Sequence, residues 1–269
     1  MRCPQIVYGT AWKKERTQSL VRQAIDCGFR GIDTAAQPKH YDEAGVGAAV
    51  KAAMDAGLPR SELYVQTKFT PVGGQDPRRI PYDSTASLPE QVAQSCESSL
   101  RNLRTDYLDC LVLHSPLSGF DQTIEVWRAM EAEASAGHAL SLGISNCYDL
   151  KSLEALYWNA RIPPSVVQNR FYSDTGYDRD IRTFCRSQGL IYQSFWTLTA
   201  NPHLLRHALV VGLAARYERT PEQILYRYLS QNGVVPLTGT RSLQHMRDDL
   251  AILDFVIASD DCRSIETLL

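Results

Sequence analysis

Four ionisable side chains lie at points in the sequence where a short apolar run gives way to a polar turn. Asp33 ends the run FRGID, Lys68 ends LYVQTK, His114 ends YLDCLVLH, and Tyr41 lies in the loop that follows Asp33. A carboxylate, an ammonium, an imidazole and a phenol can together hold, donate and accept protons. If the apolar runs are parallel strands, their carboxyl ends meet at one edge and bring these groups together.

Each of these side chains also has a structural explanation when it is taken alone. Asp33 beside Thr34 is typical of a turn, Lys68 can extend its ammonium out of a core, and His114 before a Ser-Pro pair can be a hydrogen-bonded core histidine. Their joint appearance at the ends of three successive apolar runs favours a shared site.

Short apolar runs alternate with amphipathic segments along the whole chain, which predicts an α/β protein. Most runs are apolar throughout, as in strands buried on both faces of a parallel sheet. We therefore predict one domain over 1–269, a closed (β/α)8 TIM barrel. A doubly wound open sheet is the alternative, but no G-x-G-x-x-G follows the first run. The predicted strands are 6–10, 29–33, 63–68, 107–114, 140–145, 165–169, 189–195 and 233–238. The predicted helices are 17–27, 43–54, 89–101, 121–136, 149–160, 177–187, 202–217, 220–229 and 243–253.

Composition limits the classes of partner. The chain has 269 residues, of which 44% are hydrophobic, so one large core is possible. A formal net charge of -2 argues against nucleic acid or an anionic membrane as an obligatory partner. Without an 18-residue apolar run or an export signal, a cytoplasmic protein is expected. The seven cysteines are scattered with no CxxC pair, so we predict reduced thiols and no metal site.

The chain resembles the aldo-keto reductase family over nearly its whole length. The matching segments are GIDTA with Asp33, VQTK with Lys68, LVLHSP with His114, LGISN with Asn146, VVQN with Gln168, and PLTGTRSLQHMRDDL after the last strand. The resemblance implies that NADPH supplies a hydride, that an aldehyde or ketone is reduced to an alcohol, and that an Asp, Tyr, Lys and His tetrad is catalytic. Compared with many members, the chain lacks an N-terminal hairpin before the first strand and a long C-terminal loop.

The physical logic of such a tetrad fits these residue types. A carbonyl that accepts hydride develops negative charge on its oxygen and needs a proton donor. A tyrosine with its ordinary pKa near 10 is a poor acid, and Lys68 is expected to lower the pKa of that phenol. Asp33 is then expected to keep Lys68 charged, and His114 to orient the substrate oxygen.

Two residues compete for the place of the tyrosine. In the usual family pattern it lies five residues after the aspartate, which here is Pro38. Alignment backward from Glu43 puts His40 at that place, with Tyr41 next to it. We favour Tyr41 as proton donor because a phenol suits a mechanism with Lys68, and His40 is the alternative donor or a wall of the substrate pocket.

The resemblance also assigns the cofactor and substrate residues. Phe195, or alternatively Trp196, is expected behind the nicotinamide ring, and Arg241 is expected to hold a 2′-phosphate. Trp12 and His40 are expected to bind a small carbonyl substrate with an apolar tail. The cofactor-binding residues implied are Gly9, Thr10, Ser145, Asn146, Gln168, Phe195, Thr238, Gly239, Thr240, Arg241, Gln244, Asp248 and Asp249.

Two other functions compete with this one. An NADPH-binding sensor with little turnover keeps the cofactor site but lacks a competent proton donor. A metal-dependent hydrolase could use His203 and His207, which are spaced four apart, but HLLRH lacks the glutamate of H-E-x-x-H. A monomer or a weak homo-oligomer is expected.

Overall fold

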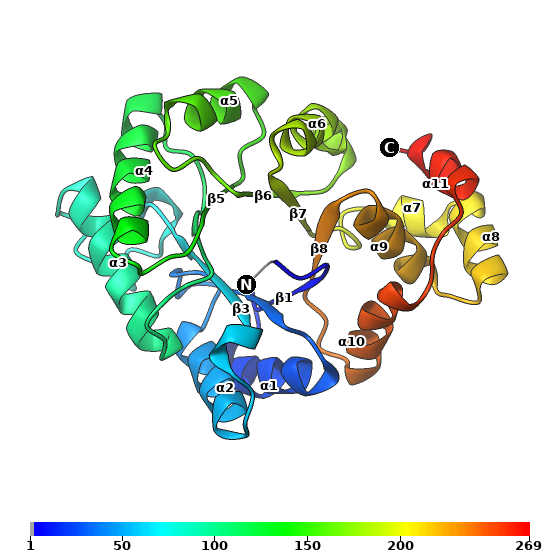
Figure 1. Cartoon of the computed structure of the whole chain (residues 1–269), viewed down its shortest axis with the longest axis horizontal. Helices are drawn as coiled ribbons and strands as arrows, with labels where there is room; N and C mark the ends of the chain where they lie inside the picture. The colour runs from blue at the N-terminus through cyan, green and yellow to red at the C-terminus, as the bar shows by residue number, and fades with distance from the viewer. Residues whose placement is uncertain (1–2) are drawn as a thin grey trace.

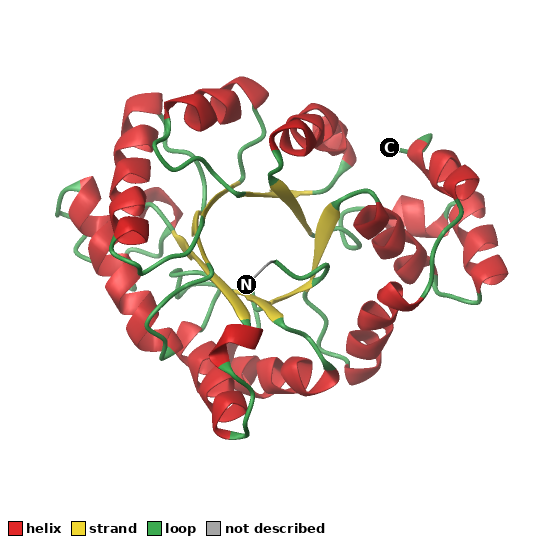
Figure 2. Cartoon of the chain, viewed as in Figure 1, coloured by secondary structure: helices red, strands yellow, loops and turns green. Residues whose placement is uncertain are grey.

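Eight parallel strands close into a barrel in the computed structural model, which describes residues 3–269 (Figures 1 and 2). Each strand pairs with the next one in sequence, and β8 pairs with β1. The predicted (β/α)8 barrel is therefore confirmed. Within residues 3–269, no hairpin strand lies before β1 (Val7–Gly9). The strands are β1 (Val7–Gly9), β2 (Gly31–Asp33), β3 (Tyr64–Phe69), β4 (Cys110–Leu113), β5 (Leu142–Ser145), β6 (Val166–Arg170), β7 (Ile191–Phe195) and β8 (Val234–Thr238).

Helices form the outer ring around the barrel (Figure 2). The α-helices are α1 (Thr17–Cys27), α2 (Glu43–Asp55), α3 (Leu88–Leu103), α4 (Phe120–Ser135), α5 (Leu150–Asn159), α6 (Arg179–Gln188), α7 (Pro202–Arg206), α8 (Ala208–Tyr217), α9 (Pro221–Gln231), α10 (Leu243–Leu250) and α11 (Ser259–Glu266). The short 3-10 helices are η1 (Lys14–Arg16), η2 (Arg60–Glu62), η3 (Val72–Gly74), η4 (Ser173–Asp178) and η5 (Ala251–Asp254). Helix α11 was not predicted, and it lies beside α8 in the outer ring (Figure 1).

Local signals explain where several helices begin. Thr220 and Gln223 form a capping box at the start of α9, where the Gln223 amide nitrogen lies 3.2 Å from the Thr220 hydroxyl. The carboxylate of Asp42 caps α2 by accepting from the Gly45 amide at 2.9 Å. Because α2 begins at Glu43, its cap also fixes the end of the loop that carries His40 and Tyr41.

The predicted single helix over 202–217 is wrong in one respect. It is interrupted at His207 and forms two helices, α7 and α8. That residue has an extended backbone, and its ring accepts a hydrogen bond from the Leu209 amide at 3.2 Å, which starts a second helix. His203 instead contacts the Tyr177 hydroxyl at 3.1 Å. The two histidines therefore do not share one helix face, which removes the basis for a helical metal pair.

The main apolar core is separate from a smaller cluster of Tyr64, Cys110, Val112 and Val166, whose side chains lie on the strand face that points into the barrel. Gln66, Gln168 and Gln193 point inward and hydrogen-bond to one another at 2.8–2.9 Å. This glutamine layer lies beneath the carboxyl ends of the strands and contacts Asp33. Near its mouth, the interior thus supports charged groups by hydrogen bonding.

Gly47 in α2 is needed for close packing against α3. A Cβ atom there would lie 2.1 Å from the carbonyl oxygen of Asn102. We expect Gly47→Ala to lower the free energy of unfolding by about 1–3 kcal/mol, as overpacking does, measured by urea denaturation. Gly212→Ala in α8 is the matched control, because nothing lies within 4 Å of its Cβ position, and it should raise stability by about 0.5–1 kcal/mol. Equal effects of the two substitutions would contradict this role for Gly47.

Candidate active site

A cavity of about 950 Å³ opens over the carboxyl ends of the strands. In barrel enzymes this face carries the active site. Most of the residues singled out from the sequence line it, namely Gly9, Trp12, Asp33, His40, Tyr41, His114, Ser145, Asn146, Gln168, Phe195, Thr238, Gly239, Thr240, Arg241, Asp248 and Asp249. Lys68, Thr10 and Gln244 do not line it.

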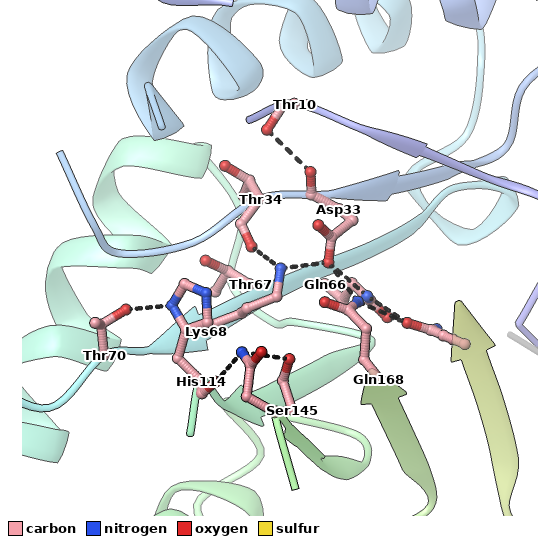
Figure 3. Close-up of polar contacts among 12 residues, drawn as sticks. Thr10, Asp33, Thr34, Gln66, Thr67, Lys68, Thr70, His114, Ser145 and Gln168 are labelled. Carbon is pink, nitrogen blue, oxygen red and sulfur yellow. Dashed lines mark hydrogen bonds and ion pairs between the residues drawn. The ribbon is translucent and has the colours of Figure 1, made fainter. Parts of the chain in front are cut away.

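Asp33 and Lys68 form a buried ion pair, with 2.5 Å between Asp33 Oδ1 and Lys68 Nζ (Figure 3). Parallel pairing of β2 with β3 brings the ends of the two strands side by side. The Lys68 ammonium also donates to the Thr34 carbonyl at 2.8 Å. Burial lowers the pKa of Lys68, and the charge of Asp33 opposes that shift. Lys68 therefore lies beneath the cavity floor and acts on it electrostatically rather than by direct contact.

The neighbours of Asp33 fix its position. Gln66 donates to Asp33 Oδ1 at 2.6 Å and Gln168 donates to the same oxygen at 3.0 Å. The Thr10 hydroxyl donates to the Asp33 carbonyl at 2.9 Å (Figure 3). Thr10, which we predicted to bind cofactor, is fully buried and holds the Asp33 backbone instead.

Tyr41 lies beside both Lys68 and His114. Lys68 Nζ is 5.3 Å from the centroid of the Tyr41 ring, and the Tyr41 and His114 ring centroids are 6.0 Å apart. Burial, with a further contribution from Asp33, raises the pKa of Tyr41. The net lowering of this pKa that we expected is therefore not found, because burial and the charge of Asp33 outweigh the effect of the Lys68 ammonium. Tyr41 is a protonated phenol at neutral pH.

His114 is neutral at physiological pH. Burial lowers its pKa to about 3, assisted by the positive charge of Lys68 and by His40. Its Nδ1 lies 2.6 Å from the Thr70 hydroxyl (Figure 3). When that hydroxyl donates to Nδ1, the ring proton is on Nε2, so the other edge of the imidazole is a hydrogen-bond donor.

His40 and Trp12 are in ring contact, tilted by 40°, at one wall of the cavity. Their ring centroids are 3.8 Å apart, and the Trp12 amide donates to the His40 carbonyl at 2.7 Å. Trp12 has a φ of 62° and is 48% exposed, so its indole is held out toward the cavity mouth. Burial lowers the pKa of His40, and its buried Nδ1 has no hydrogen-bond partner among residues 3–269.

Amide side chains lie on the opposite wall. Asn146 has a φ of 52°, a backbone conformation that asparagine tolerates, and its Nδ2 donates to the His114 carbonyl at 2.8 Å. Ser145 ends β5 and lies opposite Gln168 in the register. Phe195 ends β7 and lines the cavity together with its neighbour Trp196, so both of the predicted aromatic candidates are present.

Two cations lie near the end of β8. Arg241 donates to the Trp12 carbonyl, and Lys13 donates to the Gly239 carbonyl. Burial lowers the pKa of Lys13 to about 8, assisted by Arg241 and Arg16. These two side chains make this end of the cavity suited to an anionic group.

Four other residues at the end of β8 and in α10 pair with one another. The Thr238 hydroxyl donates to Asp249 at 2.6 Å, and burial raises the pKa of Asp249 to about 6. Gln244 donates to Asp248 at 2.9 Å, one turn further along α10. The Gln244 side chain makes this contact within the helix and does not line the cavity, whereas the sequence predicted that it binds the cofactor.

Lys13 and Arg170 are cavity residues that sequence reasoning missed. Lys13 follows Trp12 directly after the first strand, so a basic residue at a strand end was a usable signal. Arg170 lies two residues after Gln168, and the alternation of side chains along a strand places both on the inner face.

Among residues 3–269, one cluster contains three side chains of types that can bind a metal ion. The ligand atoms of Cys96, Glu133 and His138 all lie within 4.8 Å of one another. His138 Nδ1 and Glu133 Oε2 are 2.7 Å apart, so these two groups already pair without an ion.

All seven cysteines are free thiols. No helix within residues 3–269 is long and apolar enough to cross a membrane.

These features define a (β/α)8-barrel protein with a cavity at the carboxyl ends of its strands. A model of the Aldo/keto reductase family matches residues 5–206. Glyoxal reductase of Bacillus subtilis is 30% identical over 254 residues, covering 94% of this chain and 83% of that protein. The NAD/NADP-dependent indole-3-acetaldehyde reductase of Schizosaccharomyces pombe is 29% identical over 282 residues, covering 98% and 90%.

The structural comparison agrees with the sequence comparison. The crystal structure of MGS-M4, an aldo-keto reductase enzyme from a Medee basin deep-sea metagenome library, has a TM-score of 0.85 at 25% identity and covers 100% of this chain and 92% of that chain. The chain belongs to the Aldo/keto reductase family and is an oxidoreductase of a family that uses nicotinamide cofactors.

Proposed function

We propose that this protein reduces an aldehyde or ketone to an alcohol with NADPH as hydride donor and Tyr41 as proton donor. The observation that carries the proposal is the buried Asp33–Lys68 pair, with 2.5 Å between Nζ and Oδ1, next to Tyr41 and a neutral His114 at the cavity floor. A charged pair beneath a proton donor and a neutral hydrogen-bond donor is suited to stabilising a developing alkoxide.

The residues of the cavity fit a nicotinamide dinucleotide. Amides at Asn146 and Gln168 suit a carboxamide, the Phe195 ring suits the face of a nicotinamide, and Lys13 with Arg241 suits phosphate. Two cations at one end favour NADPH over NADH, because the 2′-phosphate adds negative charge. When bound, the cofactor supplies the hydride.

The protein's own residues do the remaining chemistry. His114, with its proton on Nε2, donates a hydrogen bond to the carbonyl oxygen and orients it. Tyr41 donates its hydroxyl proton to that oxygen as negative charge develops there. The Lys68 ammonium, 5.3 Å from the Tyr41 ring, stabilises the phenolate that remains. Asp33 keeps Lys68 in place, and the indole of Trp12 covers the substrate.

The experiment that tests this function mixes the purified protein with NADPH and a panel of aldehydes and ketones while cofactor absorbance is followed. Steady loss of NADPH absorbance with matching alcohol formation is expected. Tight NADPH binding with no turnover would instead favour the sensor function, and no NADPH binding would reject the cofactor assignment. A cytoplasmic location and a monomer or weak homo-oligomer stay predictions from the sequence.

Cofactor affinity should depend on pH through Lys13. Its pKa of about 8 means that the side chain is cationic below pH 8 and increasingly neutral above it. We expect the Kd for NADPH to rise by about tenfold between pH 7 and pH 10, since a charge-assisted contact is lost, measured by quenching of tryptophan fluorescence. In Lys13→Met the Kd for NADPH at pH 7 should be higher than in the wild type, and it should stay nearly constant between pH 7 and pH 10. Lys14→Met, an exposed neighbour, should retain the pH dependence. A wild-type Kd that does not change with pH would contradict this assignment.

A further inference from the structure

Arg170 brings a cation into the cavity at a place that the proposed reaction does not use. It is the last residue of β6 and lines the same cavity as His114 and Trp12. Gln168, two residues earlier, donates from the inner face of the barrel to Asp33 at 3.0 Å. Because side chains alternate along a strand, Arg170 lies on that same inner face, one layer nearer the cavity mouth.

Two aromatic rings hold the guanidinium. Arg170 Cζ lies 4.3 Å from the ring centroid of Trp196 and 5.1 Å from that of Tyr172. Cation–π contacts of this kind hold the guanidinium and leave its N–H groups available for hydrogen bonds. Trp196 has a φ of 56° and is 51% exposed, so the backbone holds its indole at the cavity mouth.

Within residues 3–269 this guanidinium has no acidic partner. No ion pair involves Arg170, and its buried Nε has no hydrogen-bond partner. Of the carboxylates that line the cavity, Asp33 pairs with Lys68 and Asp249 accepts from Thr238. A partly buried cation without a counter-charge is costly, and it is relieved by an anionic ligand.

The position of Arg170 separates it from the expected phosphate site. Lys13 follows β1 and Arg241 follows β8, and these two strands are paired neighbours. Strand β7 separates β6 from β8. The amide of Arg170 donates to the Tyr148 hydroxyl at 3.1 Å, and that hydroxyl donates to Asn146 Oδ1 at 3.1 Å. The backbone of Arg170 is therefore tied to the wall that carries Asn146 rather than to the phosphate end.

We propose that Arg170 binds a carboxylate of the substrate, so that the preferred substrates are carbonyl compounds that also carry a carboxylate group. This inference rests on the proposed reductase function and names its substrate class. The planar fork of an arginine matches the two oxygens of a carboxylate, and stacking on Trp196 fixes the direction of that fork. A neutral carbonyl compound of the same size gains nothing from this contact.

The test compares benzaldehyde with 4-carboxybenzaldehyde as substrates of the wild type and of Arg170→Met, with NADPH held constant. The wild type is expected to favour the carboxylated aldehyde by about 10- to 100-fold in kcat/KM, the scale of a charge-assisted hydrogen bond. Arg170→Met should remove that preference mainly through KM and leave benzaldehyde reduction and the Kd for NADPH within about twofold.

Arg219→Met is the matched control. Arg219 also stacks on a ring, 5.1 Å from the Phe255 centroid, and also has a buried Nε without a partner, but it does not line the cavity. Its substitution should leave the preference unchanged. Equal rates for the two aldehydes in the wild type, or equal losses for both in Arg170→Met, would overturn the proposal. A weaker Kd for NADPH in Arg170→Met would overturn it too and make Arg170 a cofactor residue.

Failure of the reductase function can be told apart from failure of this inference. If the wild type reduces neither aldehyde, the proposed reaction is rejected, and carboxylate binding is then measured directly. Binding of 4-(hydroxymethyl)benzoate and of benzyl alcohol to the protein with NADP⁺ is followed by the fluorescence of Trp196 and the other indoles. Tighter binding of the carboxylate, lost in Arg170→Met, supports the site, and equal binding overturns it.

Discussion

Replacing Tyr41 with Phe is expected to lower kcat for carbonyl reduction by about 10²- to 10⁴-fold, the usual contribution of a positioned general acid. The phenol is protonated at neutral pH, since burial and the charge of Asp33 raise its pKa. Its ring lies within 6.0 Å of His114, centroid to centroid, and 5.3 Å from Lys68 Nζ, so a phenylalanine ring preserves these contacts. Single-turnover oxidation of NADPH measures the loss, and the Kd for NADPH should change less than about twofold.

His40→Phe is the control that separates the two candidate proton donors. A phenylalanine ring keeps the ring contact with Trp12, whose centroid lies 3.8 Å away, but removes the ionisable nitrogens. If Tyr41 is the donor, this variant should keep kcat within about tenfold and change mainly KM. An active Tyr41→Phe together with an inactive His40→Phe would transfer the role to His40, whose Nδ1 is buried without a partner among the described residues.

The barrel was predictable because its strands have a strong sequence signal. The runs that end at Asp33, Lys68 and His114 are apolar and bounded by turns, and their order along the chain is their order in the barrel. The break at His207 was not predictable in this way. Apolar periodicity continues through Leu204 and Leu209, while the ring of His207, an uncommon capping residue, starts the second helix. Helix α11 was missed because it buries little more than Ile265.

The geometry of the candidate site was only partly predictable. Strand ends located Asp33, Lys68 and His114, and closure of the barrel brings the strand ends together. The direction of the pKa shift of Tyr41 depends on how deeply the ring is buried and on which groups the Lys68 ammonium contacts. Neither property can be inferred from the spacing of residues in the sequence. Arg170 was missed because its role depends on Trp196, whose positive φ cannot be inferred from residue types.

Replacing Lys68 with Met is expected both to destabilise the fold and to remove activity. The side chains of Lys68 and Asp33 are 1% and 4% exposed, so the substitution leaves a buried carboxylate without its counter-charge. Loss of one partner from such a pair costs about 3–5 kcal/mol of unfolding free energy. Reduction should fall by about 10²- to 10³-fold, the scale for removal of one preorganised electrostatic group. Urea denaturation and single-turnover oxidation of NADPH measure the two effects.

The double variant Asp33→Asn with Lys68→Met separates structure from catalysis. The amide oxygen that replaces the carboxylate of Asp33 can still accept from Gln66 and Gln168, which donate to Asp33 Oδ1 at 2.6 Å and 3.0 Å, and neither charge of the pair remains. Unfolding free energy should therefore recover to within about 1 kcal/mol of wild type, while the rate of reduction stays as low as in Lys68→Met. If activity returned together with stability, the buried pair would be a structural feature only, and stabilisation of the Tyr41 phenolate by Lys68 would be ruled out.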